Sequence, residues 1–371
     1  MTTKRAFLIL AVALALIASA CGNDNSAASD DEGSSGGASG GGGGGPIACL
    51  GEEGCVPEGQ PDVNGDGDIK IGVLSPGDTN DNGYYESFIV TARQFADEND
   101  WELITLDQVN PSDAAEQARN LCRQQVDMVA IAAGELADAL PVASEDVCAT
   151  SVWYVAGGAG VEQTPYFFQS NEVPGPTQFV TGYATGLVME ALGIESAGFV
   201  TGPELDFSRM AFSAFTAGIH QTLPDAETVA TYTGDFDDSA LGQQAANAQL
   251  AQGVGILYPY LGGATDAVAT AGAERDVLSI TPGTDRCEEE QFAVSSIFSP
   301  GDYFAATLDD FQAGEVELGV SRLFEIGVDP VPTVKVCPSV EGHEEMQEQV
   351  DAMIADIASG EVDVDALIEA G

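Results

Sequence analysis

From residue 69 onward, short apolar runs alternate with segments whose apolar residues recur at helical spacing. The apolar runs have the length of buried strands, and this alternation is typical of parallel sheets covered by helices on both faces. In the first half of the chain it predicts strands at 69–74, 102–106, 127–132, 152–155 and 167–169, with helices at 83–98, 111–125 and 135–148.

A second series of the same kind follows. It predicts helices at 175–192, 208–222, 239–252, 264–273, 303–314 and 342–358, and strands at 196–201, 228–232, 255–260, 277–281, 293–298, 323–327 and 333–337. Two similar series in tandem predict an α/β fold with two Rossmann-like lobes, parallel sheets and a cleft between them. We assign residues 66–172 plus 286–325 to the first lobe, and 173–285 plus 326–371, with the C-terminal helix, to the second.

The N-terminus has the features of an export signal. Lys4 and Arg5 precede an apolar core at 6–17, and small residues at 18–20 lead to Cys21, so residues 1–20 are predicted to be a signal peptide. The junction resembles the lipobox of bacterial lipoproteins, which implies lipidation of Cys21; simple secretion after residue 20 is the alternative. Residues 21–65 are rich in Gly, Ser and Asp and predict a flexible tether with a small cysteine loop.

The charge balance excludes several partners. The formal net charge is −49, from 60 acidic and 11 basic residues. Because there is no basic stripe, we expect no nucleic-acid binding and no attraction to anionic lipid. Attachment to the membrane would therefore depend on the lipid anchor.

Six cysteines remain after Cys21, an even number in an exported chain, and this predicts disulfides. They lie as sequence neighbours, so we predict the pairs Cys49–Cys55, Cys122–Cys148 and Cys287–Cys337. The last pair is expected beside the crossings between the lobes. Zinc is disfavoured because no cysteines have CxxC spacing and the chain has only two histidines.

One acidic loop is a candidate for calcium. Asp62, Asn64 and Asp66 have the spacing of the first ligands of a calcium loop, but Val73 stands where the loop needs a carboxylate. An acidic linker into the first strand is the alternative, and we predict no metal and no cofactor.

The stretch 70–88 reads as strand, polar turn and helix. In an open α/β sheet such a strand end is where small ligands bind, so Asp81, Tyr84, Tyr85 and Glu86 are candidate binding residues. An ordinary β–α turn with solvated polar residues is the alternative.

Several stretches resemble the basic membrane protein family, the lipid-anchored substrate-binding proteins of bacterial ABC importers that include purine nucleoside receptors. They are Asn80–Tyr84, Gly182-Tyr183, Thr233–Asp238 with Gly242, Gly262-Gly263 and Gly283–Asp285. The resemblance spans roughly residues 69–360 and implies a type I periplasmic binding protein fold with a multi-strand hinge. Tyr85-Glu86 stands where the family usually has Asn-Gln, and Ala211 where nucleoside receptors place a stacking Phe, so a nucleoside is the default ligand only.

The resemblance also implies residue roles. Tyr84 would stack on a base, Asp81 and Glu86 would accept hydrogen bonds from its N–H groups, and Asp285 would accept them from ribose hydroxyls. The other candidate ligand-binding residues are Tyr85, Gly134, Arg209, Tyr260, Gly262 and Gly263. For Tyr84, Asp285 and Arg209 the alternatives are packing on the lobe, a turn cap and a surface position.

The expected function is that of an extracytoplasmic binding lipoprotein at the cell membrane, a monomer that works with ABC permease and ATPase subunits. The chain has no HExxH, P-loop or Ser–His–Asp order, so we predict that it is not an enzyme. A sensory receptor that is not coupled to transport is an alternative, and a hydrolase acting on nucleosides or sugars is a weaker one.

Overall fold

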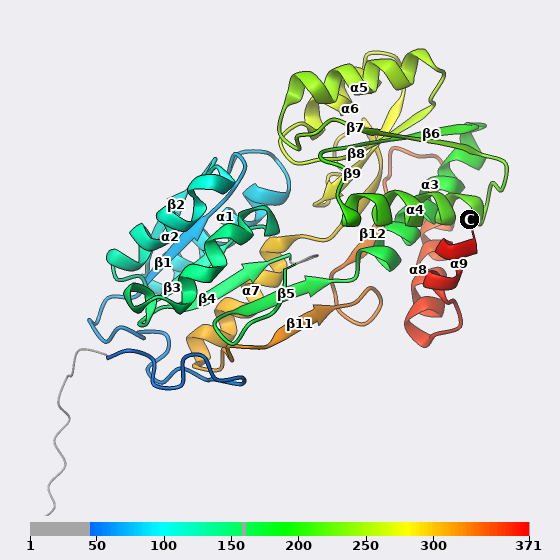
Figure 1. Ribbon diagram of the computed structural model, residues 1–371. Helices are drawn as coiled ribbons and strands as arrows, with labels where there is room; N and C mark the ends of the chain where they lie inside the picture. The colour runs from blue at the N-terminus through cyan, green and yellow to red at the C-terminus, as the bar shows by residue number, and fades with distance from the viewer. Residues whose placement is uncertain (1–44, 158–160, 371) are drawn as a thin grey trace, which may run out of the picture. The chain divides into compact units, whose positions relative to one another are not determined.

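A computed structural model describes residues 45–157 and 161–370. Cys21 and the predicted signal peptide lie outside these residues. The chain forms two six-stranded sheets, each with helices on both faces, which confirms the predicted fold class (Figure 1). Within the described part of the chain, no helix combines the length and the apolarity needed to cross a bilayer.

The first sheet is entirely parallel, in the order β11-β5-β4-β3-β1-β2. Its strands are β1 (Lys70–Leu74), β2 (Glu102–Leu106), β3 (Met128–Ile131), β4 (Val152–Ala156), β5 (Phe168–Glu172) and β11 (Ser321–Phe324). Alternate residues of these strands face opposite sides. Ile71, Val73 and Tyr154 pack on α1 (Tyr84–Asn99) and α7 (Pro300–Ala313). Leu74 and Trp153 pack on α2 (Ala114–Arg123) and on the 3₁₀ segment Gly134–Ser144.

The second sheet has the order β12-β10-β9-β8-β6-β7, and only β12 is antiparallel to its neighbour. Its strands are β6 (Ser196–Thr201), β7 (Glu227–Tyr232), β8 (Ile256–Tyr260), β9 (Leu278–Gly283), β10 (Phe292–Ile297) and β12 (Thr333–Val336). One face packs on α3 (Pro174–Leu192), α4 (Asp206–His220), α8 (His343–Ser359) and α9 (Val364–Ala370). The other face packs on α5 (Ser239–Ala251) and α6 (Thr265–Ala273).

Two sequence expectations need correction. Strand β10 was expected in the first lobe with residues 286–325, but it pairs with β9 and β12 in the second sheet. The chain returns to the first sheet only after β10, where α7 packs on α1. The helix expected at 135–148 is a 3₁₀ segment, Gly134–Ser144, that contains Pro141. A proline inside a helix removes a backbone donor, which disfavours a regular α-helix there.

The three predicted disulfides are present: Cys49–Cys55, Cys122–Cys148 and Cys287–Cys337. The second joins the end of α2 to the short 3₁₀ turn Asp146–Cys148. The third was expected beside the crossings between the lobes. Because β10 belongs to the second sheet, this bond instead joins the β9–β10 loop to the residue after β12, within one lobe.

Candidate functional site

A cavity of about 580 Å³ lies where the carboxyl ends of strands from both sheets meet. This is the edge at which open parallel sheets bind ligands. Seven of its lining residues are aromatic: Tyr84, Tyr85, Phe207, Phe236, Tyr260, Phe298 and Tyr303. The remainder are aliphatic, glycine or acidic: Pro174, Leu205, Met210, Leu261, Pro282, Gly134, Gly157, Gly262, Gly283, Glu135, Glu172 and Asp206.

Three aromatic rings form a continuous part of the wall. Tyr84 lies at the start of α1, Tyr260 ends β8, and Phe298 follows β10. The ring centroids of Tyr84 and Phe298 are 6.4 Å apart, and those of Tyr260 and Phe298 are 6.0 Å apart. These rings give the cavity the flat apolar surfaces on which a planar ligand packs.

Glycines give the tyrosine rings room. A Cβ on Gly157 would lie 2.5 Å from the hydroxyl of Tyr84, and its φ of +63° also favours glycine. A Cβ on Gly262 would lie 2.9 Å from the ring of Tyr85. Gly134 also lines the cavity, directly after β3. The positions predicted from sequence that the fold brings together here are therefore Tyr84, Tyr85, Gly134, Tyr260 and Gly262.

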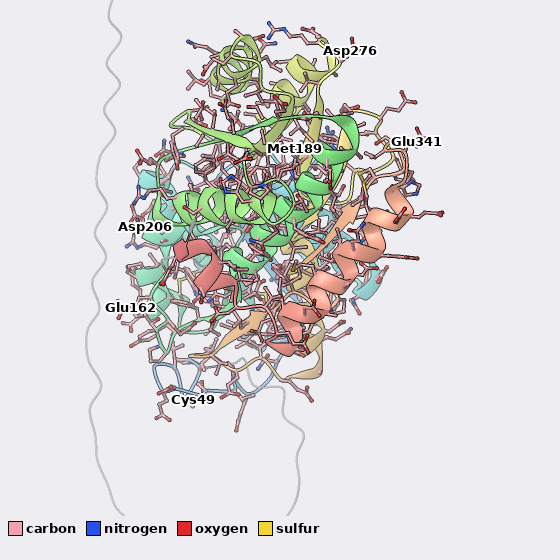
Figure 2. All side chains as sticks on the ribbon, turned by 90° about the vertical axis from the view of Figure 1, so that its right-hand side faces the viewer. Cys49, Glu162, Met189, Asp206, Asp276 and Glu341 are labelled. Atoms are coloured by element: carbon pink, nitrogen blue, oxygen red, sulfur yellow. A yellow bond between two sulfur atoms is a disulfide. The ribbon has the colours of Figure 1, made fainter. Side chains whose placement is uncertain are left out.

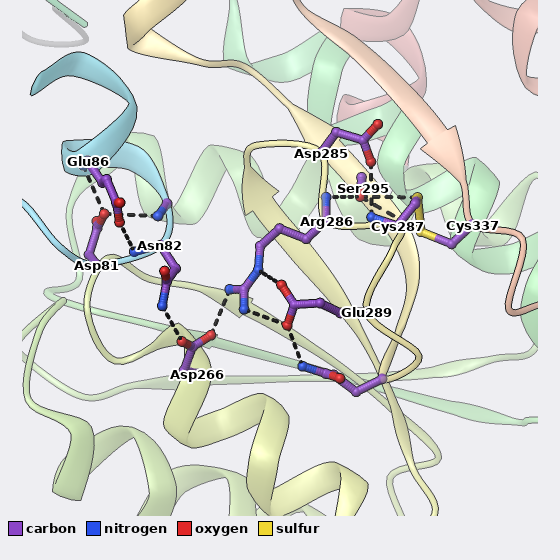
Figure 3. Close-up of polar contacts among 12 residues, drawn as sticks. Asp81, Asn82, Glu86, Asp266, Asp285, Arg286, Cys287, Glu289, Ser295 and Cys337 are labelled. Atoms are coloured by element: carbon purple, nitrogen blue, oxygen red, sulfur yellow. Dashed lines mark hydrogen bonds and ion pairs between the residues drawn. A yellow bond between two sulfur atoms is a disulfide. The ribbon is translucent and has the colours of Figure 1, made fainter. Parts of the chain in front are cut away.

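Asp81 lies beside the cavity but does not line it. Its carboxylate accepts the backbone N–H groups of Gly83 and Tyr85 at 2.9 and 3.1 Å. It also accepts that of Glu86 at 2.9 Å (Figure 3). Burial raises the pKa of Asp81, although these hydrogen bonds oppose the increase. Because its oxygens accept these N–H groups at the start of α1, Asp81 orients the helix that carries Tyr84.

Glu86 also stabilises the turn before α1. Its Oε2 accepts the backbone N–H of Asn82 at 2.7 Å, so it closes the loop before α1 and does not line the cavity. Gly263 likewise lies outside the lining, and its N–H donates to Asp237 Oδ1 at 2.7 Å.

Asp285, for which we expected a sugar-binding role, lies outside the cavity lining. Its carboxylate accepts the N–H of Cys287 at 3.0 Å (Figure 3). It also pairs with Lys335 Nζ at 2.7 Å. Partial burial raises the pKa of Asp285, but these two hydrogen bonds outweigh burial and leave the pKa below its usual value. The hydrogen bond from Cys287 agrees with the turn cap that we named as the alternative, and the ion pair with Lys335 is an additional contact.

Arg209 is a surface residue. Its guanidinium pairs with Glu204 and Asp206, and its side chain is 49% exposed. Figure 2 shows Asp206 at the N-terminal end of α4, and its side chain is 96% exposed at the mouth of the cavity. Arg209 therefore does not enter the cavity, in agreement with the surface alternative.

Two acidic residues that the sequence did not single out line the cavity. Glu135 Oε1 accepts the hydroxyl of Tyr85 at 3.1 Å, and Glu172 Oε2 accepts the hydroxyl of Tyr303 at 3.0 Å. Burial raises the pKa of Glu172 to about 7, and the hydrogen bond from Tyr303 offsets only part of this increase. Burial also raises the pKa of Glu135, with the negative charge of Asp237 adding to the effect. Glu172 ends β5, and Glu135 lies four residues after β3, so a position at or just after a strand end is the signal by which they could have been found.

The acidic loop at 62–68 is closed by its own backbone. Asp62 accepts the N–H of Gly67, Asn64 that of Asp66, and Asp66 that of Asp68. Asp66 also pairs with Lys70 Nζ at 3.0 Å. Among the residues that the structure describes, no three acidic, histidine or cysteine side chains are grouped to hold a metal.

Comparison with known proteins identifies the family. The family model described as ABC transporter substrate-binding protein PnrA-like matches residues 68–360. No curated protein matches the chain.

Solved structures of ABC transporter components share the fold. The solute-binding protein from Conexibacter woesei DSM 14684 is 21% identical with a TM-score of 0.62 over 80% of this chain and 98% of its own. The solute-binding protein from Aeropyrum pernix K1 is 18% identical with a TM-score of 0.68 over 80% and 92%. The arabinose transporter's periplasmic binding protein from Shewanella sp. ANA-3, solved with arabinofuranose, is 15% identical with a TM-score of 0.53 over 80% and 99%. The family match spans both sheets and every element that lines the cavity, and the chain therefore belongs to the PnrA-like ABC transporter substrate-binding proteins.

Proposed function

We propose that this protein is the lipid-anchored, extracytoplasmic binding component of an ABC importer and that it holds a small polar ligand with a flat ring in the cavity. The observation that carries the proposal is the cavity itself, which both sheets line with the carboxyl ends of their strands. Its partners would be the permease and ATPase subunits with which this family works. Nucleosides are the ligand class to which the family resemblance points.

The shape of the wall supports a ring-bearing ligand. Tyr84, Tyr260 and Phe298 present aromatic surfaces, while Glu135 and Glu172 supply hydrogen-bond acceptors beside them. A pocket that combines apolar surfaces with a few placed polar groups is typical of a small-molecule site. The role is binding without turnover, so a bound compound is expected to be recovered chemically intact.

Loss of the Tyr84 ring is expected to weaken ligand binding. In Tyr84→Ala the ligand loses a stacking surface worth about 1–2 kcal/mol, so its dissociation constant should rise roughly tenfold or more. Calorimetry with a panel of nucleosides, sugars and amino acids would first identify a ligand and then measure this change. Tyr232→Ala is the matched control, because Tyr232 ends β7 and does not line the cavity. If Tyr84→Ala and wild type bind the ligand with equal affinity, the ligand does not stack on Tyr84.

The anchor rests on sequence alone. The lipobox-like junction at Cys21 and the glycine-rich tether that follows support attachment by lipid. In Cys21→Ala the protein is expected to leave the membrane fraction, because nothing else in this acidic chain would hold it at an anionic surface. Cell fractionation measures this, and unchanged membrane retention would refute lipid attachment.

A further inference from the structure

We propose that the ligand of this cavity carries a positive charge on or beside its ring. The inference rests on the proposed function, because it takes the cavity to be the ligand site. Its basis is a combination of half-buried carboxylates and aromatic faces with no basic side chain among the described lining residues. A site of this composition recognises an ammonium group or a cationic ring.

Apart from Asp206, the acidic groups at the cavity pair with no basic side chain among the described residues. Glu135 and Glu172 line it, and Asp237 stands just behind, with Oδ1 2.6 Å from where a Cβ on Gly262 would lie. Two basic residues lie near lining segments in the sequence. Arg286 pairs with Asp266 and Glu289, which do not line the cavity. Arg209 pairs with Glu204 and with the exposed lining residue Asp206, and neither arginine pairs with Glu135 or Glu172. Residues 158–160, which follow the lining residue Gly157, are Gly-Ala-Gly and bring no charge.

Each carboxylate retains capacity for a ligand. Glu135 accepts one side-chain hydrogen bond, from Tyr85, and Glu172 accepts one, from Tyr303. An ionised carboxylate has two oxygens and several acceptor sites, so N–H groups of a ligand can be accepted as well. A neutral ligand would leave these half-buried carboxyl groups without a counter-charge, whereas a cation would favour their ionised form.

The aromatic wall suits the same charge. The face of an aromatic ring carries a negative quadrupole and attracts cations within about 6 Å of its centre. Tyr84, Phe298 and Tyr260 follow one another along the wall with centroid separations of 6.4 and 6.0 Å, so more than one ring can contact a ligand at once. Rings and carboxylates therefore favour the same class: a nucleoside with a cationic base, or an aromatic amine.

Two matched pairs of probes test the charge directly. 1-Methyladenosine is a cation at pH 7 and adenosine is neutral, while tyramine carries an ammonium where tyrosol carries a hydroxyl. Calorimetry at pH 7 with the full chain is expected to show at least one cation binding about tenfold or more tightly than its neutral partner. Binding of a neutral partner as tightly as, or more tightly than, its cation in both pairs overturns the inference and leaves the proposed site intact. If none of the four probes binds, the inference is wrong. The proposed function is wrong as well only if the nucleosides, sugars and amino acids of the panel also fail to bind.

Isosteric variants assign the effect to the two carboxylates. Glu172→Gln and Glu135→Gln keep the side-chain shape and remove one charge each, so each is expected to weaken the cation about tenfold while the neutral partner changes less than about threefold. Glu274→Gln, at the exposed end of α6, is the matched control and should change neither. If the cation binds both cavity variants as tightly as wild type, the carboxylates do not recognise its charge and the inference is wrong.

Discussion

Replacing Gly218 by alanine is expected to lower the free energy of unfolding by about 3 kcal/mol. Gly218 lies on α4 where this helix crosses α3. A Cβ at this position would lie 2.0 Å from the carbonyl oxygen of Phe179, and one on Gly182 of α3 would lie 2.0 Å from that of Phe215. The atoms met are backbone, so no side-chain rotation relieves the clash and the two helices must move apart.

Separation of these helices would disturb the centre of the second lobe. Phe179 and Phe215 are fully buried there with Phe199 and Tyr258. Interior packing leaves few voids, so a shift of one helix loses contacts along its length. Urea unfolding followed by circular dichroism would measure the loss, with Gly175→Ala of α3 as control, because its Cβ would lie at an ordinary 3.6 Å from Ile368. If Gly218→Ala and Gly175→Ala are equally stable, the crossing is less tight than described.

Local patterns in the sequence were enough to place most elements of the fold. The apolar run at 69–74 and the helical periodicity at 83–98 correspond to β1 and α1 within one or two residues. Strand β10 shows the limit of this approach. Its sequence predicts a buried strand, but the choice of β9 and β12 as partners depends on pairing between distant segments, which a local pattern does not contain.

The sequence predicted lining residues of the candidate site only where a helix start or a strand end was enough to place them there. Tyr84 and Tyr260 lie at a helix start and a strand end, and both line the cavity. Asp285 lies at a strand end too, but Lys335, which is distant in sequence, pairs with it outside the cavity. Glu172 was not predicted, because the neighbouring sequence does not show which of the 60 acidic residues loses contact with water on folding. Its pKa depends on contacts with α7 that only the folded chain creates.

Between pH 5 and pH 8, Glu172 is expected to reduce the free energy of unfolding by about 2.5 kcal/mol. Its pKa in the folded protein is raised to about 7 from an ordinary value of 4.5. Between these two values the folded state holds the proton more tightly than the unfolded state does. The stabilisation is therefore fully present below pH 4.5 and is lost as the pH rises through 7.

Glu172→Gln isolates this contribution. The amide is neutral at every pH and its oxygen still accepts the hydroxyl of Tyr303, so the variant is expected to lose less stability than wild type between pH 5 and pH 8 and to be the more stable protein at pH 8. Urea titrations at intervals across this pH range measure the loss of stability and the difference in stability at pH 8. The exposed Glu274→Gln is the control. The free energy of unfolding of the variant should still fall somewhat with pH, because burial also raises the pKa of Asp127 to about 6 and raises that of Glu135. A variant that keeps the full wild-type slope would mean that Glu172 ionises as an ordinary exposed carboxylate, and the cavity would then lack the buried charge on which its preference for cations depends.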